Sequence, residues 1–507
     1  MTRPRLVPTL VAVVLLHLVV AGWFALHRPI DGDEGYYGLA ASLVSEGRQP
    51  YADFFYPQAP LLPYVYAPFA RLVGAPQLPG LRLWSVALGG LALALLAAWA
   101  VRAHGGRPWI GVAALLLAAL SPELLTWLVT VKTYALTAVA AAAAVSACVR
   151  VGGPGRRAWL WGAPVAWRWD WAHPSGCCSH RPRSRPRCGG SRAGPTDARG
   201  SGRWLLGLAI GVLPLLLAWH ADPARFWFDN LGYHRLRFSA LEDAPVWQRA
   251  SAALQTLAMS ILANPGLLVL VGLGVAGLRP RPPREAAADA AVAPSVAMAT
   301  VYTLTCLAPD PVYMQYFTGV LPILLVPAAA RGLGRLRWPD TRVAAAAGGL
   351  MAAAALLSLS LIRHDLAVEP HWQLDQYRRV CGRIAAMTHE DDIVFAFWSG
   401  YPAGSGRRPL PGMENHFGVG VSERLDRLER RRYRIIGREE LARAFRGHEA
   451  ALAVVGTWMY DINTALDPQM VQLLGQFTGN YELVEQIDDV KLCRPAAAPP
   501  APGRGGG

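Results

Sequence analysis

Three carboxylates fall within four positions in the segment Asp31-Gly32-Asp33-Glu34, directly after a long apolar run. A carboxylate can accept the proton of a hydroxyl group that attacks an electrophilic carbon, so this segment is a candidate for general base catalysis. The alternative interpretation is structural: Asp33 only caps a following helix, and Asp31 and Glu34 only favour the positive end of the helix dipole. The local sequence alone supports both.

The residues after this segment predict a helix that positions the acids. Tyr36, Leu39, Ala40 and Leu43 recur at helical spacing, and Gly47 is a suitable stop. This pattern predicts an amphipathic helix lying on the outer surface of a membrane.

The composition indicates a multi-pass membrane protein. Of 507 residues, 53% are hydrophobic and 17% charged, and the apolar residues form blocks of about 20, the length that crosses a bilayer. The predicted spans lie near 7–26, 83–101, 108–128, 133–149, 204–219, 253–278, 288–308, 317–330 and 341–362. The first has no small-x-small cleavage site after it and is predicted to be an anchor rather than a cleaved signal peptide.

The arginines predict the orientation, because Lys and Arg collect on the cytoplasmic side. Arginines precede the first span and follow the second, the fourth and the spans that end near 278 and 330. The N-terminus is therefore expected in the cytoplasm of a plasma-membrane protein. The segments expected outside are 27–82, 220–252, 309–316 and everything after 362.

The stretch 167–203 breaks this pattern. Between 163 and 203, eight Arg against two Asp contribute +6 of the total charge of +14, which is typical of a disordered basic linker. A second hypothesis is that a frameshift has overwritten part of a helical hairpin, because Trp-Arg-Trp-Asp-Trp in a shifted frame gives Ala-(Leu/Met/Val)-Gly-Leu. A restored hairpin would raise the nine visible spans to eleven.

The loop after the acidic segment supplies a family resemblance. It reads "GRQPYADFFYPQAPLLPYVYAPF" and contains Tyr51, Asp53, Phe54, Tyr56, Gln58, Pro60 and Leu61. Together with Asp33-Glu34 after the first span, it resembles the first outer loop of the GT-C superfamily of integral-membrane glycosyltransferases, which includes protein O-mannosyltransferases and lipid A aminoarabinose transferases. The resemblance implies an all-α polytopic GT-C membrane domain over 1–362, with the catalytic loop at 27–82.

The resemblance also implies an activity. The family transfers a sugar, with inversion, from a polyprenyl-phosphate donor to a hydroxyl of a lipid, glycan or protein acceptor outside the membrane. Asp33 matches the family's base, and Glu34 would orient the acceptor or Asp33 itself. Gln58 stands where the family often has a lysine, so a phosphate anchor is not assigned in this loop. No cofactor is specified, and a divalent metal remains open.

Further candidate substrate-binding residues lie in the outer loops. Lys132 could face a phosphate or simply anchor the interface. In the loop 220–252, aromatic residues alternate with Arg225, His234, Arg235 and Arg237, which indicates either anion contacts or an interfacial aromatic belt. Four residues at the mouth of a span could meet sugar hydroxyls or form a helix-start turn: Asp310, Tyr313, Gln315 and Tyr316. Membrane lipids are expected partners, and nucleic acid is not.

The C-terminal part, 363–493, has the composition of a small extracytoplasmic α/β domain. Strands are predicted at 392–398 and 450–458, helices at 422–433 and 438–445, and a long loop at 399–418 that binds acceptor or covers the membrane cleft. Cys381 and Cys493 either pair or remain buried thiols. Residues 494–507 form an Ala/Pro/Gly tail expected to be disordered.

Two other functions remain open. A transporter or flippase of lipid-linked saccharides would hold ionisable residues near the middle of its spans, and these regions of the sequence are nearly free of charge. A catalytically dead relative would keep the same loop.

Overall fold

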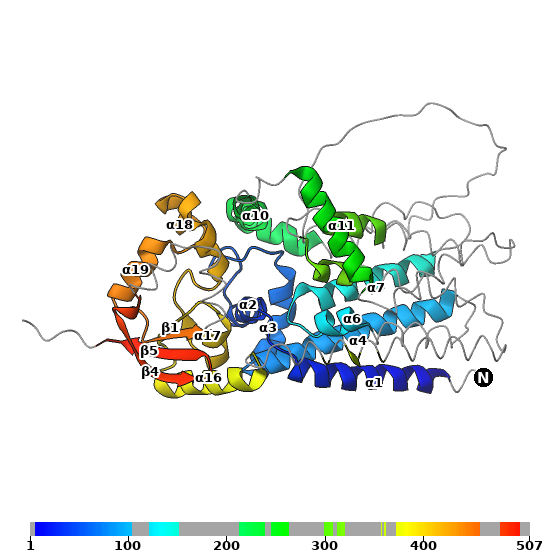
Figure 1. Ribbon diagram of the computed structural model, residues 1–507. Helices are drawn as coiled ribbons and strands as arrows, with labels where there is room; N and C mark the ends of the chain where they lie inside the picture. The colour runs from blue at the N-terminus through cyan, green and yellow to red at the C-terminus, as the bar shows by residue number, and fades with distance from the viewer. Residues whose placement is uncertain are drawn as a thin grey trace, which may run out of the picture.

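The structure is a computed structural model that describes residues 6–103, 121–151, 212–238, 245–262, 299–307, 312–319, 356, 359–360, 363, 372–456 and 477–496. They form a helical part and a C-terminal α/β unit at one end of it (Figure 1). The predicted frameshifted stretch 167–203 lies outside the described residues.

The helical part has the following elements among the described residues: α1 (Leu6–His27), α2 (Glu34–Ser45), α3 (Leu61–Val73), α4 (Leu78–Ala103), α6 (Pro122–Leu128), α7 (Thr133–Val151), α9 (Pro223–Trp227), α10 (Tyr233–Phe238) and α11 (Val246–Leu262), a π-helix at Phe228–Gly232 and a 3₁₀ helix at Met314–Gly319.

Three predicted spans coincide with helices α1, α4 and α7. Among the described residues, Leu78–Ala98 of α4 is the one helix long and apolar enough to cross a membrane, and the pair α6 and α7, bent by 110° at its break, could form one broken span. The other predicted spans lie wholly or largely outside the described residues, so the count of nine or eleven stays a prediction.

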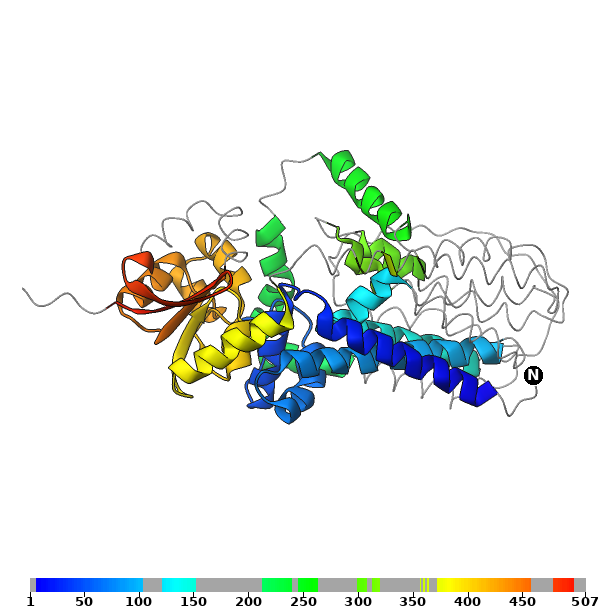
Figure 2. The same ribbon diagram turned by 60° about the horizontal axis from the view of Figure 1, so that its bottom comes forward.

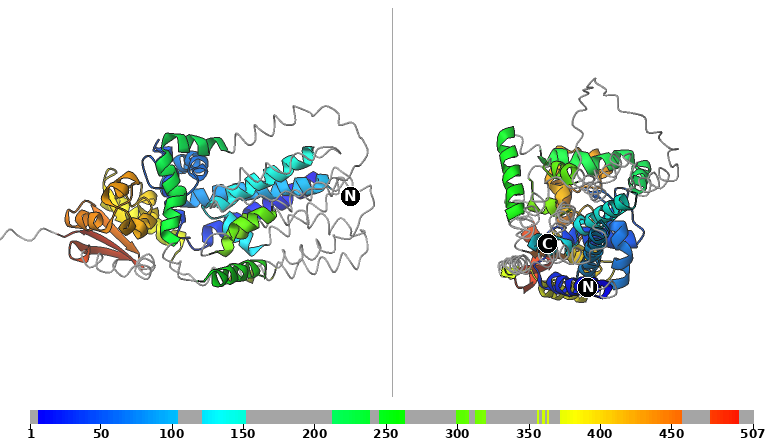
Figure 3. Two further views of the ribbon diagram at one scale, coloured as in Figure 1. Left: turned by 90° about the horizontal axis from the view of Figure 1, so that it is seen from above. Right: turned by 90° about the vertical axis from the view of Figure 1, so that its right-hand side faces the viewer.

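Helices α1 and α4 run side by side away from the α/β unit (Figures 2 and 3). Small residues allow their close approach: a Cβ at Gly90 would lie 2.5 Å from Leu18 Cδ2. The outer face of α1 remains apolar and open, with Leu16 59% and Val19 69% exposed. Such a stripe would be unfavourable in water and suits contact with lipid.

Helix α2 exists as predicted, but it is covered by protein on most sides; its position at the membrane surface stays a prediction. Nine of its residues are buried, because α2 packs between α3, α4 and the α/β unit. A Cβ at Gly35 would lie 2.4 Å from Trp398 Nε1, so only glycine fits there. Gly47, at φ +90°, follows the helix end as predicted.

A buried ion pair joins the helix ends around α2. Arg82 of α4 and Glu34 of α2 are both fully buried, and Arg82 Nε and Nη2 donate to the two Glu34 oxygens at 2.9 and 2.5 Å. Glu34 also accepts from the backbone N–H groups of Asp31 (2.9 Å) and Val131 (3.0 Å). The guanidinium further donates to carbonyls at the end of α1, those of Ala25, Arg28 and Pro29, at 2.8 to 3.1 Å.

The α/β unit contains a five-stranded sheet of order β2-β1-β3-β5-β4. Its elements are α16 (Leu374–Met387), β1 (Ile393–Ala396), α17 (Gly400–Ser405), β2 (Arg408–Pro409), a 3₁₀ helix at His416–Arg424, α18 (Arg427–Arg432), α19 (Arg438–Arg446), β3 (Leu452–Gly456), β4 (Tyr481–Ile487) and β5 (Val490–Pro495). Strand β1 pairs in parallel with β2 and β3, whereas β5 pairs antiparallel with β3 and β4.

The sequence predicted β1, β3, α18 and α19 and missed α16, β2, β4 and β5. The segment 399–418 was expected to lack regular structure, which is wrong in part: it contains α17, whose six residues are all buried. Cys381 and Cys493 are buried free thiols, so they do not pair. The disordered tail predicted at 494–507 is wrong at its start, because strand β5 reaches Pro495; residues 497–507 lie outside the described residues.

Arg82→Met is expected to destabilise the protein strongly, because it leaves the buried carboxylate of Glu34 without its counter-charge. Removing one partner of a buried pair typically costs about 3–5 kcal/mol. The apparent Tm of the detergent-solubilised protein, followed by size-exclusion fluorescence, should fall by several degrees. Arg378→Met is the control, since Arg378 makes an exposed i,i+3 pair with Asp375; an equal Tm for the two variants would contradict the structural role of Arg82.

Candidate functional site

A cavity of about 280 Å³ lies where the acidic segment, the α6–α7 break, α10 and the α/β unit meet. Its walls carry the two aspartates, a lysine, an arginine, a histidine and many aromatic residues. The lining residues are Asp31, Gly32, Asp33, Tyr36, Tyr37, Pro57, Gln58, Lys132, Thr133, Tyr134, Tyr233, His234, Arg237, Tyr313, Gln315, Tyr316 and Phe417.

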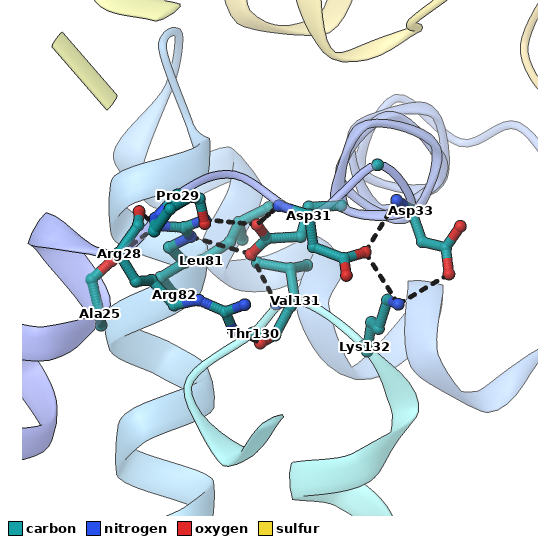
Figure 4. Close-up of polar contacts among 12 residues, drawn as sticks. Ala25, Arg28, Pro29, Asp31, Asp33, Leu81, Arg82, Thr130, Val131 and Lys132 are labelled. Carbon is teal, nitrogen blue, oxygen red and sulfur yellow. Dashed lines mark hydrogen bonds and ion pairs between the residues drawn. The ribbon is translucent and has the colours of Figure 1, made fainter. Parts of the chain in front are cut away.

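Lys132 bridges the two aspartates. Its Nζ lies 2.8 Å from Asp31 Oδ1 and 2.8 Å from Asp33 Oδ2 (Figure 4). The ammonium group is almost fully buried, whereas the side chain of Asp33 is 32% exposed. The lysine is therefore a fixed structural charge, and Asp33 keeps one side open to the cavity.

Local geometry holds this arrangement in place. Lys132 ends the break between α6 and α7, its Nζ lies 5.1 Å from the centre of the Trp127 ring, and its backbone N–H donates to Thr130 O at 2.8 Å. On the other side, Asp33 N–H donates to Asp31 Oδ1 at 2.9 Å, which fixes the turn that carries both acids.

The two aspartates have opposite shifts in pKa. Burial acts to raise the pKa of Asp31, but Lys132 and Arg28 outweigh it, so this pKa lies below its ordinary value. Burial also raises the pKa of Asp33; Lys132 lowers it, the negative charge of Asp31 raises it, and the net pKa lies above its ordinary value. Asp31 is thus the permanent anion of the pair, and Asp33 is the stronger base.

The purely structural interpretation of the acidic segment does not fit Asp33. The residue occupies the N-cap position of α2, but its side chain makes no capping hydrogen bond. Its carboxylate turns instead towards Lys132 and the cavity (Figure 4).

Two predicted site residues do not line the cavity. Glu34 is fully buried and paired with Arg82, which leaves no room for contact with an acceptor. Of its two predicted roles, orienting the acceptor does not fit this position, and orienting Asp33 does. Arg225 donates from Nη1 to Ala52 O at 2.9 Å and pairs with Asp222 at 3.3 Å, so it braces the 50–54 segment and does not face the cavity.

The remaining predicted residues, Gln58, Lys132, His234, Tyr313 and Gln315, do line the cavity together. Tyr51 fixes the backbone of Gln58, because its Oη donates a hydrogen bond to the backbone carbonyl of Gln58 at 2.6 Å. His234 Nε2 lies 3.1 Å from Pro57 O, so α10 and the loop before α3 form one wall.

Arg237 and Tyr316, which the sequence pattern also pointed to, line the cavity as well. The aromatic lining residues that sequence reasoning did not assign to a site are Tyr36, Tyr37, Tyr134, Tyr233 and Phe417. Phe417 comes from the α/β unit, and only the folded structure brings it to the cavity. Arg237 lies 5.1 Å from the centre of the Phe417 ring.

The α/β unit contacts the acidic turn directly. Trp398 Nε1 donates to the carbonyl of Gly32, the residue between the two aspartates, at 2.9 Å. The α/β unit also contacts the segment before α10, where the ring of Tyr433 stacks on Phe228 with the ring centroids 3.7 Å apart. The segment 399–418 was predicted to bind acceptor or cover the cleft, and the position of Phe417 in it agrees with a covering role.

The donor set of the cavity does not fit a divalent cation well. Among the described residues, no group of three or more His, Cys, Asp or Glu side chains gathers in a geometry that could hold a metal ion. The two aspartates converge on Lys132 Nζ, so an ammonium group already occupies the position a cation would take between them.

No protein-family model matches the sequence, and a search of curated proteins gave no match. The fold, in contrast, matches solved structures over nearly the whole chain. The crystal structure of ArnT from Cupriavidus metallidurans bound to undecaprenyl phosphate has a TM-score of 0.61 and 13% identity, covering 98% of this chain and 99% of that one. The same protein in the apo state has a TM-score of 0.58 and 14% identity, covering 96% and 97%. The chain therefore shares its fold with this ArnT protein over nearly its whole length.

Proposed function

We propose that the protein is an inverting glycosyltransferase that moves a sugar from a polyprenyl-phosphate donor to an acceptor hydroxyl. The observation that carries this proposal is the open carboxylate of Asp33, with a raised pKa, in a cavity lined by cations and hydroxyl groups. The fold shared with ArnT, a protein crystallised with undecaprenyl phosphate, supports the choice of donor.

Asp33 acts as the general base. The acceptor oxygen attacks the anomeric carbon from the face opposite the phosphate, and its proton passes to Asp33 as the new carbon–oxygen bond forms. The bond from the anomeric carbon to the phosphate oxygen breaks, and the lipid phosphate leaves with the electron pair. Attack from the opposite face inverts the configuration at the anomeric carbon.

The cations of α10 are suited to the leaving phosphate. Lys132 is already paired with both aspartates, so Arg237, with His234 beside it, is the better phosphate contact. Gln58 and Gln315 and the tyrosines supply hydrogen bonds of the kind that sugar hydroxyl groups accept and donate. The proposal requires no metal between the aspartates, because Lys132 supplies the positive charge there.

The proposed setting is the plasma membrane, with the N-terminus in the cytoplasm and the cavity and the α/β unit outside. The open apolar face of α1 supports contact with lipid, and the arginine distribution supports the orientation. The acceptor, whether lipid, glycan or protein, approaches from the outer side.

Asp33→Asn is expected to lower transfer by about 10²–10⁴-fold, because the amide cannot accept the acceptor proton. The measurement is transfer from a panel of radiolabelled polyprenyl-phosphate sugars in membranes that contain the protein. Binding of undecaprenyl phosphate should be unchanged in this variant and weakened in Arg237→Gln.

Asp375→Asn is the matched control, since this aspartate is on the exposed face of α16. Equal transfer by the wild type and Asp33→Asn would remove Asp33 from its role. Movement of intact labelled lipid across the bilayer without transfer, by both proteins, would instead support a transporter.

The acid limb of the pH profile should move in opposite directions in two variants. Transfer requires ionised Asp33, so kcat/KM rises with pH through a pKa above the ordinary aspartate value of about 3.9. Lys132→Met removes a charge that lowers this pKa, so the limb should move to higher pH. Asp31→Asn removes a charge that raises it, so the limb should move to lower pH.

Only the midpoint of each profile is compared, because both replacements also change the cavity. Asp375→Asn should leave the midpoint unchanged. Shifts of the same sign in Lys132→Met and Asp31→Asn would contradict the assignment of the titrating group to Asp33.

A further inference from the structure

A second cleft, of about 630 Å³, lies between the 48–53 segment of the helical part and the α/β unit. This volume is within the range of about 300–1,000 Å³ that is typical of small-ligand sites. The floor of the cleft is apolar and includes Ile393, Ile435 and Ile436, and its rim carries five arginines against three carboxylates.

Three of the rim arginines are neutralised by neighbouring acids. Arg48 pairs with Glu414 at 3.5 Å and Arg430 with Glu440 at 3.1 Å, while Arg408 turns to Asp391 outside the cleft. The third rim carboxylate, Asp53, accepts from Gln49 N–H at 2.7 Å.

Arg431 and Arg434 retain their charge. Both are exposed, and within the part of the chain that the structure describes no carboxylate forms an ion pair with either. Arg434 Nε donates to Ala52 O at 3.3 Å, which leaves the rest of its guanidinium group available. The cleft therefore has a positive rim above an apolar floor, which suits an anion on a larger body.

The end of helix α18 positions Arg434 beside the cleft. Arg434 follows the C-cap Tyr433 and has a φ of +58°, the left-handed conformation with which helices commonly end. The chain turns here and continues into Ile435 and Ile436, which line the cleft.

The cleft and the catalytic cavity share two walls. Asp53 lines the cleft, and Pro57 and Gln58 of the same loop line the cavity. In the α/β unit, Glu414 lines the cleft and Phe417, three residues later, lines the cavity. A molecule seated in the cleft is thus separated from the cavity only by two short segments.

We propose that this cleft binds a phosphate or carboxylate group of an anionic glycoconjugate through Arg431 and Arg434, and that this molecule is the acceptor. The second clause rests on the proposed glycosyltransferase function; the anion site does not. The apolar floor holds the body of the ligand, and the two guanidinium groups fix its charged end while another part of it reaches the cavity.

The test measures binding rather than transfer. The full-length protein is placed in phosphatidylcholine nanodiscs and titrated calorimetrically with mannotriose carrying one 6-phosphate, and with neutral mannotriose. The phosphorylated probe should bind at least tenfold more tightly than the neutral one, and its Kd should rise with salt. The double variant Arg431→Gln/Arg434→Asn should lose at least tenfold in affinity; Asn is chosen at 434 because it tolerates a positive φ.

The matched control is Arg427→Gln/Arg432→Gln, which removes the same charge from α18 at positions outside the cleft and should bind like the wild type. Equal binding of the two probes, or equal loss in both double variants, would overturn the site. Binding that appears only when the nanodiscs contain phosphatidylglycerol would assign the cleft to a membrane lipid and overturn the acceptor assignment. Undecaprenyl phosphate binding should be unaffected by Arg431→Gln/Arg434→Asn, so failure of the donor site is distinguished from failure of the cleft.

Discussion

The ion pair between Arg82 and Glu34 determines where Asp33 lies. Two fully buried charges are tolerated only when they are paired and fully hydrogen-bonded. The hydrogen bonds of this pair join four parts of the chain: the end of α1, the start of α2, helix α4 and the α6–α7 break. Since Asp33 immediately precedes Glu34, its backbone has no independent freedom. The same pair fixes Val131, and therefore Lys132 beside it.

This constraint explains how three neighbouring carboxylates acquire three different roles. Glu34 has a structural role as the partner of Arg82. Asp31 is held as an anion by Lys132 and Arg28. Asp33 shares the same lysine but also experiences the charge of Asp31, so it is the acid whose proton affinity is raised. Environments that push the pKa values of adjacent groups apart are typical of acid–base sites. One lysine thus both supports the anionic turn and limits the basicity of Asp33.

The sequence predicted the features that depend on local pattern and could not predict those that depend on tertiary contacts. The lengths of the apolar runs located α1, α4 and α7, and the charge pattern located Asp33, Lys132 and His234.

The sequence could not rank Arg225 above or below Arg237, because both alternate with aromatic residues. Only the packing shows that Arg225 binds Ala52 and that Arg237 faces the cavity. The burial of Glu34 was hidden for the same reason, since its partner Arg82 lies 48 residues away. Strand β4 lies at the edge of the sheet and is largely exposed, so it lacks the run of buried apolar residues that located β1 and β3.

The α/β unit is part of the site rather than an attachment to it. Its Trp398 donates a hydrogen bond to the carbonyl of Gly32, its Phe417 lines the cavity, and its Tyr433 stacks on Phe228. Its contacts therefore reach both the turn that carries Asp33 and the segment that leads into helix α10. In the proposed reaction, the lipid-linked donor enters from the side where α1 and α4 run away from this unit (Figure 1). The α/β unit bounds the opposite approach, so the proposal assigns selection of the acceptor to the surface where its arginines and the 48–53 segment meet.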